Sequence, residues 1–250
     1  MEATRRIAGQ ASKVSRAAHD ITFDPVNDEI IVANPSAQAI TTFRGGADGD
    51  EAPLRIIQGP STHIQSPGYG VTVDAVHDEL FVVEGRSRNT FGERREEYIL
   101  VFPRTSNGDT APIRVIRGPD TMLENTQAIA VDPVRNLIVV GSDNGALIFN
   151  RTDNGNVKPR AIIRNPDGER TISSNFRLVP ETGYIVSAVR QGGIEVWHIT
   201  DDGDVPPAYL LTNPDGEIGG GRVALNPNAK EVIVAGRTSV AVYSFPEIFE

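Results

Sequence analysis

The segment GVTVDAVHDELFVV, from Gly70 to Val83, carries the pattern that decides the fold of this chain. It reads as a short apolar strand, a turn that begins at an aspartate, and a second apolar strand. The same arrangement returns four more times, as ITFDPVNDEIIVA from Ile21, IAVDPVRNLIVVG from Ile129, FRLVPETGYIVSA from Phe176 and VALNPNAKEVIVA from Val223. The turns, at positions 24, 74, 132, 179 and 226, follow one another at intervals of 50, 58, 47 and 47 residues. An internal repeat of this length predicts an architecture built from similar units.

Each unit holds two further strands. The third strands are AITTF from Ala39, YILVF from Tyr98, ALIFN from Ala146, IEVWHI from Ile194 and VAVYSF from Val240. The fourth strands follow a proline, in PLRIIQGP from Pro53, PIRVIRGP from Pro112, PRAIIRNP from Pro159 and PAYLLTNP from Pro207. Four short strands in a repeat of about 40–50 residues are typical of a propeller blade. The sequence therefore predicts an all-β chain, a five-bladed β-propeller of four-stranded antiparallel blades, with residues 1–250 forming a single domain.

The two ends of the chain complete the repeat when they are joined. The last unit ends with its third strand, Val240–Phe245, and the chain begins with a lone fourth strand at Arg5–Gly9. Counting from Asn226 through both ends to Asp24 gives 48 residues, which matches the other intervals. We therefore expect Arg5–Gly9 to pair with Val240–Phe245 and close the ring, an arrangement that also hides two sheet edges. The alternative is an open fragment of a longer propeller.

Composition excludes several classes of function. The formal net charge of −9 argues against a nucleic-acid partner, because binding to phosphates needs a basic surface. No run of 18 apolar residues predicts a membrane-spanning helix, and the N-terminus lacks the apolar stretch of a signal peptide. The absence of cysteine removes disulfides, thiolate catalysis and cysteine-based zinc sites. We find no nucleophile motif, metal-binding motif or phosphate-binding loop, so we expect no cofactor and no metal.

The turns that join third to fourth strands are rich in Asp, Asn and Gly. They read GGADGDEAP, RTSNGDTAP, RTDNGNVKP and TDDGDVPP. Pairs such as Asn-Gly and Asp-Gly tolerate the positive φ of tight hairpins. Calcium binding is the alternative, but these turns lack the length and the distal glutamate of a calcium loop. We also expect Asp24, Asp74 and Asp132 to cap the turns that follow them, through hydrogen bonds to the turn backbone.

A ring of polar residues is the first candidate site. In a propeller, the loops before the innermost strands share one face around the central channel. The residues expected at this mouth are His19, Asp20, Tyr69, Gln127, Asn175 and Arg222. Their mixture of donors and acceptors suits a small polar or anionic ligand, whereas simple hydration is the alternative.

A long insertion in the second unit is the second candidate. It runs from Glu84 to Tyr98 and mixes arginines with glutamates. One interpretation is a solvated, internally paired hairpin. The other is an arm that docks a protein partner, because exposed aromatic and arginine side chains are favoured at interfaces. The candidate partner-binding residues of the arm are Arg86, Arg88, Phe91, Arg94 and Arg95.

The frame carried by GVTVDAVHDELFVV and YILVFPRTSNGDTAPIRVIRGP resembles the NHL-type repeat over nearly the whole chain. The resemblance implies a propeller that binds proteins or ligands and is often extracytoplasmic in bacteria, so we expect a secreted or periplasmic protein. Such propellers commonly have six blades, and five would narrow the channel. Our leading hypothesis is a non-enzymatic, monomeric binding scaffold for a protein or a small polar ligand. The alternative is a metal-dependent, lactonase-like hydrolase at the channel mouth, for which Asp20 and Asn175 resemble part of the family's metal-binding set.

Overall fold

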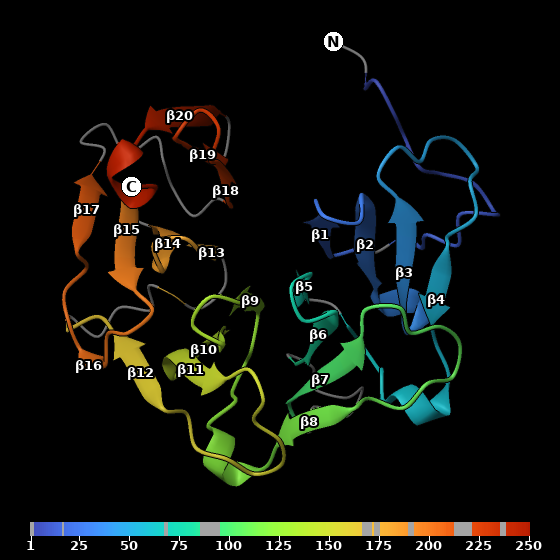
Figure 1. Cartoon of the computed structure of the whole chain (residues 1–250), viewed down its shortest axis with the longest axis horizontal. Helices are drawn as coiled ribbons and strands as arrows, with labels where there is room; N and C mark the ends of the chain where they lie inside the picture. Colours follow the sequence, from blue (N-terminus) through green and yellow to red (C-terminus); the bar gives the residue numbers. More distant parts are fainter. Residues whose placement is uncertain are drawn as a thin grey trace. The chain divides into compact units, whose positions relative to one another are not determined.

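The repeated strand pattern folds into five antiparallel sheets in a computed structural model of the chain (Figure 1). The structure describes residues 3–16, 18–67, 70–85, 96–166, 172, 176–189, 193–212, 222–235 and 239–250. In these ranges the helices are single turns of 3₁₀ type, at Pro35–Ala37, Pro60–Thr62, Pro119–Thr121 and Pro246–Ile248. Apart from the short β16, which lies beside β12, the strands of each sheet neighbour one another in chain order. This is the meander that four short strands joined by tight turns are expected to form.

The chain divides into two compact units, and the first holds two sheets. This unit comprises residues 1–121 and 152–157. The first sheet contains β1 (Asp20–Asp24), β2 (Glu29–Asn34), β3 (Ala39–Arg44) and β4 (Arg55–Ile57). The second sheet contains β5 (Gly70–Asp74), β6 (Glu79–Glu84), β7 (Tyr98–Pro103) and β8 (Arg114–Arg117).

The second unit, residues 122–151 and 158–250, holds the other three sheets. The third sheet contains β9 (Ala128–Asp132), β10 (Leu137–Ser142), β11 (Gly145–Asn150) and β12 (Ala161–Arg164), with β16 (Gly203–Asp204) parallel to β12. The fourth contains β13 (Phe176–Val179), β14 (Tyr184–Val189), β15 (Gly193–His198) and β17 (Tyr209–Thr212). The fifth contains three described strands, β18 (Val223–Asn226), β19 (Glu231–Ala235) and β20 (Val240–Ser244).

The aspartates after the first strands cap their turns, as the sequence predicts. Oδ1 of Asp24 accepts the backbone N–H groups of Val26 and Asn27 at 3.0 and 3.1 Å. Asp74 makes the corresponding pair of bonds at 3.0 and 3.1 Å, and Asp132 accepts the Arg135 N–H at 2.9 Å. All three side chains are fully buried, so each carboxylate replaces lost water with bonds to its own turn.

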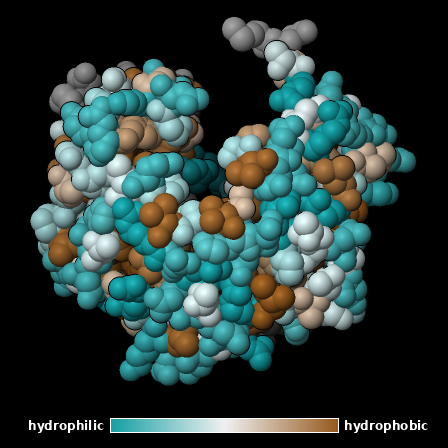
Figure 2. All heavy atoms as spheres, in the orientation of Figure 1, coloured by the Kyte–Doolittle hydropathy of each residue, from teal (hydrophilic) through white to brown (hydrophobic). Residues whose placement is uncertain are grey.

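The third strand of each of the first four sheets carries one large aromatic side chain that is buried. Phe43, Phe102, Phe149 and Trp197 occupy equivalent positions, and none of the four is exposed to solvent. Trp197 also donates its Nε1–H to the carbonyl of Val205 at 3.2 Å, which satisfies its polar atom inside the core. The face drawn in Figure 2 is mostly hydrophilic, with apolar residues scattered singly or in small groups. The apolar side chains of the repeated strands are therefore mainly buried in the core.

The turns between third and fourth strands also contact a segment that precedes their own repeat. Each carries a triplet of Asp or Asn, Gly, and Asp or Asn, which we call the clasp: 48–50, 107–109, 154–156 and 202–204. The glycine of each clasp forms a parallel bridge with a preceding segment, in the pairs Ile7–Gly49, Ile57–Gly108, Ile116–Gly155 and Ile163–Gly203. The first side chain of each clasp accepts a backbone N–H from that segment, at 2.8 Å from Arg6 and at 2.9 Å from Ile56, Val115 and Ile162. The clasps thus tie the segment at Ile7 and the strands β4, β8 and β12 to the turn of the repeat that follows each of them.

The third clasp residue explains the glycines that end the fourth strands. Oδ1 of Asp109 accepts the Ser61 N–H at 2.7 Å, directly above Gly59. A Cβ on Gly59 would lie 2.5 Å from this oxygen, and the residue has a φ of +138°. Gly9 is covered by Asp50 in the same way, with a φ of +124°. Only glycine allows both the backbone conformation and this close approach.

Asp48 of the first clasp predicts how the stability of this contact depends on pH. Hydrogen bonds from the backbone N–H groups of Arg6 and Gly49 hold the pKa of Asp48 below its usual value. A carboxyl group with a lowered pKa in the folded state stabilises the fold above its unfolded pKa of about 3.9, and this contribution is lost as pH falls through the lowered value. We expect the Ala8 amide, which donates to Gly49, to lose protection from hydrogen exchange in that acidic window.

The matched control for this measurement is Asp48→Asn, because asparagine holds the same position in the second and third clasps. An asparagine keeps the acceptor oxygen and does not titrate in this range. The expected result is a smaller loss of Ala8 protection on acidification than in the unmodified protein. An identical loss in both proteins would show that Asp48 is not the titrating group.

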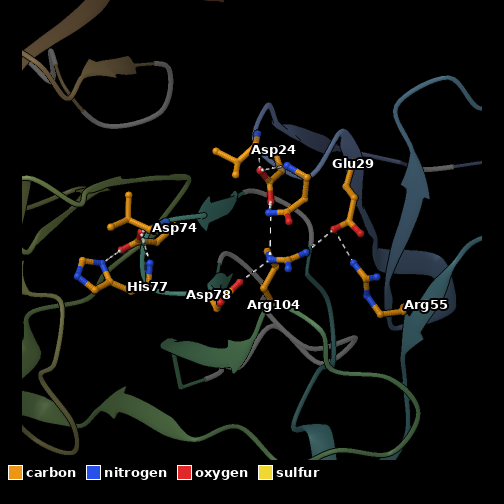
Figure 3. Close-up of polar contacts among 10 residues, drawn as sticks. Asp24, Glu29, Arg55, Asp74, His77, Asp78 and Arg104 are labelled. Atoms are coloured by element: carbon orange, nitrogen blue, oxygen red, sulfur yellow. Dashed lines mark hydrogen bonds and ion pairs between the residues drawn. The ribbon is translucent and has the colours of Figure 1, made fainter.

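A buried ion network joins the first two sheets (Figure 3). Arg104, at the end of β7, contacts Glu29 and Asp78 at 2.9 Å and lies 3.8 Å from Asp24. Glu29 also pairs with Arg55 of β4 at 2.6 Å. The Arg104 side chain is 11% exposed and Glu29 and Asp24 are buried, so these two carboxylates meet Arg104 largely away from water, whereas Asp78 is 71% exposed. Three carboxylates from two sheets therefore converge on one guanidinium group.

Candidate binding site

The residues predicted at the channel mouth lie at the starts of their sheets, as far as the structure describes them. His19 precedes β1 and its N–H donates to the Ala33 carbonyl at 3.3 Å. Asp20 is the first residue of β1, and its Oδ2 accepts the Val71 N–H at 2.9 Å. Asp20 therefore links the innermost strands of the first two sheets. The residues belong to two units, since Gln127 and Arg222 lie in the second. Their gathering into one site stays a prediction.

Several other predicted site residues lie outside the described part of the chain. Tyr69 and Asn175 of the predicted mouth are among them. So are all the candidate arm residues, Arg86, Arg88, Phe91, Arg94 and Arg95. The described chain resumes at Glu96, within the last part of the insertion.

A polar groove of about 490 Å³ lies in the first unit, beside the residue where the described chain resumes. Its walls come from the loop before β5, the start of β7, strand β8 and the third clasp. The lining residues are His63, Gln65, Glu96, Tyr98, Val115, Arg117, Asn154 and Gly155. Segments distant in sequence thus form one concave surface, which is a common setting for a binding site.

The floor of the groove is held rigidly by backbone hydrogen bonds. The Gly155 N–H donates to the Val115 carbonyl at 2.7 Å, and the Arg117 N–H donates to the Gly155 carbonyl at 3.1 Å. Asn154 accepts the Val115 N–H at 2.9 Å. On the opposite wall the buried Tyr98 donates its hydroxyl hydrogen to the His63 carbonyl at 2.9 Å. The side chains of His63, Gln65, Glu96 and Arg117, at the rim of the groove, are exposed to solvent.

The position of His63 follows from the local turn. Thr62 Oγ1 donates to the Gly59 carbonyl at 2.7 Å and accepts the Ile64 N–H at 3.1 Å. This closes a tight loop in which His63 has a φ of +60°. The left-handed backbone places His63 at the exposed edge of the loop, while Thr62 and Ile64 on either side are buried.

The rim combines several kinds of polar group. Arg117 offers a planar set of donors that suits a carboxylate, and Glu96 offers acceptors. His63 and Gln65 can donate or accept, and all four residues are exposed. In the described ranges no group of three or more His, Asp or Glu side chains could hold a metal ion. The groove is therefore equipped for recognition of a polar, extended ligand.

Comparison with known proteins supports the architecture. No family model matches the chain, and no curated protein matches it. Among solved structures, the β-propeller domain of Cps50 (Swd1) from Myceliophthora thermophila has a TM-score of 0.64 and 10% identity, over 96% of this chain and 69% of its own. The chain is a five-bladed β-propeller.

A second solved structure has a similar fold. A functionally unknown protein from Desulfotomaculum acetoxidans DSM 771 has a TM-score of 0.62 and 16% identity, over 91% of this chain. This chain spans 65% of the length of that protein. At such low identities the similarity concerns the fold alone. Among the described residues, no helix has the length and apolar character needed to cross a membrane.

The groove cannot be located from the sequence alone. The glycine and asparagine of the third clasp read as part of a hairpin turn, and in the structure they also form a wall of the groove. The signal was present in the repeated triplet, whose first side chain keeps an acceptor oxygen in all four copies. A tight turn alone does not require this, so the repetition indicates an additional contact.

Proposed function

We propose that this propeller is a non-enzymatic binding scaffold that holds an extended polar segment of a protein partner in the groove between His63 and Arg117. The observation that carries the proposal is the contrast between a floor closed by hydrogen bonds and a rim of exposed polar side chains. An acidic side chain of the partner would bind Arg117, and donors of its backbone would bind Glu96. A charged hydrogen bond of this kind contributes roughly 1.5–3 kcal/mol.

The arm stays part of this proposal because Glu96 and Tyr98, at the C-terminal end of the insertion, line the groove. The NHL-type resemblance also favours a binding role. We further propose that Arg5–Gly9 closes the ring beside β20. The metal-dependent hydrolase has no observation in its favour among the described residues.

Selection from a random peptide library tests the binding proposal. The unmodified protein is expected to enrich peptides that contain an acidic residue, and Arg117→Ala should weaken their binding at least about tenfold. Arg160→Ala is the matched control, because Arg160 is an exposed arginine outside the groove. Failure to enrich any peptide, or equal binding by both variants, would refute this function.

A further inference from the structure

The outer edge of β17, the fourth strand of the fourth sheet, lacks a contact that the other fourth strands have. Clasps bind β4, β8 and β12 on this edge. The strand β17 is the last of its sheet, and within the described ranges no residue bridges its outer side. An open strand edge presents backbone N–H and C=O groups that can pair with a further segment.

The strand register shows which groups of β17 face outward. Ile162 of β12 is opposite Leu147, and its N–H points out of the sheet to Oδ1 of Asp202 at 2.9 Å. Leu210 holds the same place in the fourth sheet, opposite Glu195 of β15. The N–H and C=O groups of Leu210 therefore point away from β15, toward the open edge.

The side chains of β17 are more exposed than their counterparts. Ile57, Ile116 and Ile163, which bridge the clasp glycines, are at most 2% exposed. Leu211 holds their position in the fourth sheet and is only partly buried. Leu210 is 56% exposed, whereas its counterparts in β4, β8 and β12 are partly buried. Two leucines thus lie at an edge that a clasp covers in the other sheets.

The fifth repeat places different chemistry at the clasp position. Counted from the aromatic residue of the third strand, residues 248–250 stand where residues 202–204 stand in the fourth repeat. Ile248 has no side-chain acceptor and is fully buried, and its carbonyl accepts the hydroxyl hydrogen of Thr182 at 2.7 Å. Pro246–Ile248 forms a 3₁₀ turn. These residues are therefore engaged within their own unit and do not form a clasp on β17.

We propose that the outer edge of β17 binds a turn of a partner protein that carries Asp-Gly-Asp, the sequence of the first and fourth clasps. The first aspartate of the turn accepts the Leu210 N–H, and its glycine lies beside Leu211 in parallel orientation. The residue after the second aspartate donates its N–H to the Thr212 carbonyl. The proposal is independent of the polar groove, because β17 belongs to the second unit and the groove to the first.

The fourth clasp shows why this occupant fits the edge. On β12, the carboxylate of Asp202 accepts the Ile162 N–H, and the Val205 N–H donates to the Arg164 carbonyl at 3.1 Å. The glycines of the four clasps have φ between +67° and +85°, a conformation that favours glycine. A carboxylate also forms a stronger bond with an N–H group than a neutral acceptor does. The edge therefore selects an acidic residue followed by glycine.

A peptide copied from the fourth clasp tests the proposal. The probe is ITDDGDVPP, residues 199–207 of this chain, with both ends capped. In an NMR titration of the isotope-labelled protein, we expect the amide signals of Leu210, Leu211 and Thr212 to shift. Asp202→Ala in the peptide should weaken binding at least about tenfold, because a charged hydrogen bond is lost. No shift at millimolar peptide, or equal binding of both peptides, would overturn the proposal.

Two variants of one residue test the role of the backbone. Leu210→Pro removes the outward N–H, and proline is tolerated where the N–H of an edge strand faces solvent. Leu210→Ala is the matched control, because it shortens the side chain and keeps the N–H. The proline variant should lose the shifts and the alanine variant should keep them, whereas an equal response would overturn the proposal. The comparison of the two peptides on the unmodified protein does not depend on the folding of either variant.

The mass in solution distinguishes a partner from a second copy of the chain. The unmodified protein is expected to have the monomer mass of 27.0 kDa. A dimer that Leu210→Pro dissociates would show that the edge pairs with a second copy, and this would overturn the proposal. Arg117→Ala, which tests the polar groove, should leave the shifts at Leu210 unchanged, so the two binding proposals can fail separately.

Discussion

Replacing Arg104 with methionine is expected to lower the free energy of unfolding by about 3 kcal/mol, because the variant leaves buried carboxylates without their shared cation. Glu29 keeps Arg55 as a partner, but it loses the contact with Arg104 at 2.9 Å. Asp24 is fully buried and loses the guanidinium group 3.8 Å away. The long apolar side chain of methionine retains much of the packing, so the effect reports mainly on charge.

Urea denaturation of the two proteins measures this change. The matched control is Arg44→Met, which breaks the ion pair with Glu51 on the surface, where the arginine side chain is 54% exposed. Exposed pairs contribute about 1 kcal/mol or less. Equal losses in the two variants would contradict a buried network that joins the sheets.

The local repeat was enough to predict the sheets. Alternating apolar residues and turn residues set the strands, and the buried aspartates Asp24, Asp74 and Asp132 cap their turns as expected. These features depend on neighbours in the sequence or on one adjacent strand. Their physical causes can therefore be read from a single unit of the repeat.

The contacts between repeats were not predictable in the same way. Asn107 and Asp109 follow the composition of any tight turn, yet they bind the backbone of Ile56 and Ser61 about fifty residues earlier. The polar groove likewise depends on which loops the fold brings together. A turn signal describes backbone conformation and does not reveal which surface the turn contacts.

The candidate sites show the same difference. His19 and Asp20 lie at the start of β1, a position that follows from strand order, whereas their place around a channel stays a prediction. The use of Asp20 to hold the Val71 N–H could not be foreseen, since it depends on the distance between two sheets. The arginines that pair with Glu29 and Glu79 could be identified only once the strand register was known.

A disulfide between Ile7→Cys and Val240→Cys is expected to form and to raise the free energy of unfolding by roughly 5 kcal/mol, because it closes a loop of more than 200 residues. The proposed ring closure places Ile7 opposite Val240, as Ile57 is opposite Ile40 in the first sheet. Directly opposed residues of antiparallel strands have Cα atoms about 4.5–5.5 Å apart, which suits a disulfide. The chain has no other cysteine, so the product is unambiguous. Ile7→Cys with Val134→Cys is the control, because Val134 lies in an exposed turn outside the proposed contact.

Mass spectrometry of the oxidised, unreduced double-cysteine protein is the most direct test of the account. A monomer that carries one internal disulfide, absent from the Val134 control, is the predicted result. Two free thiols after oxidation, or a bond that forms only between two chains, would contradict the pairing of Ile7 with Val240 and with it the closed ring.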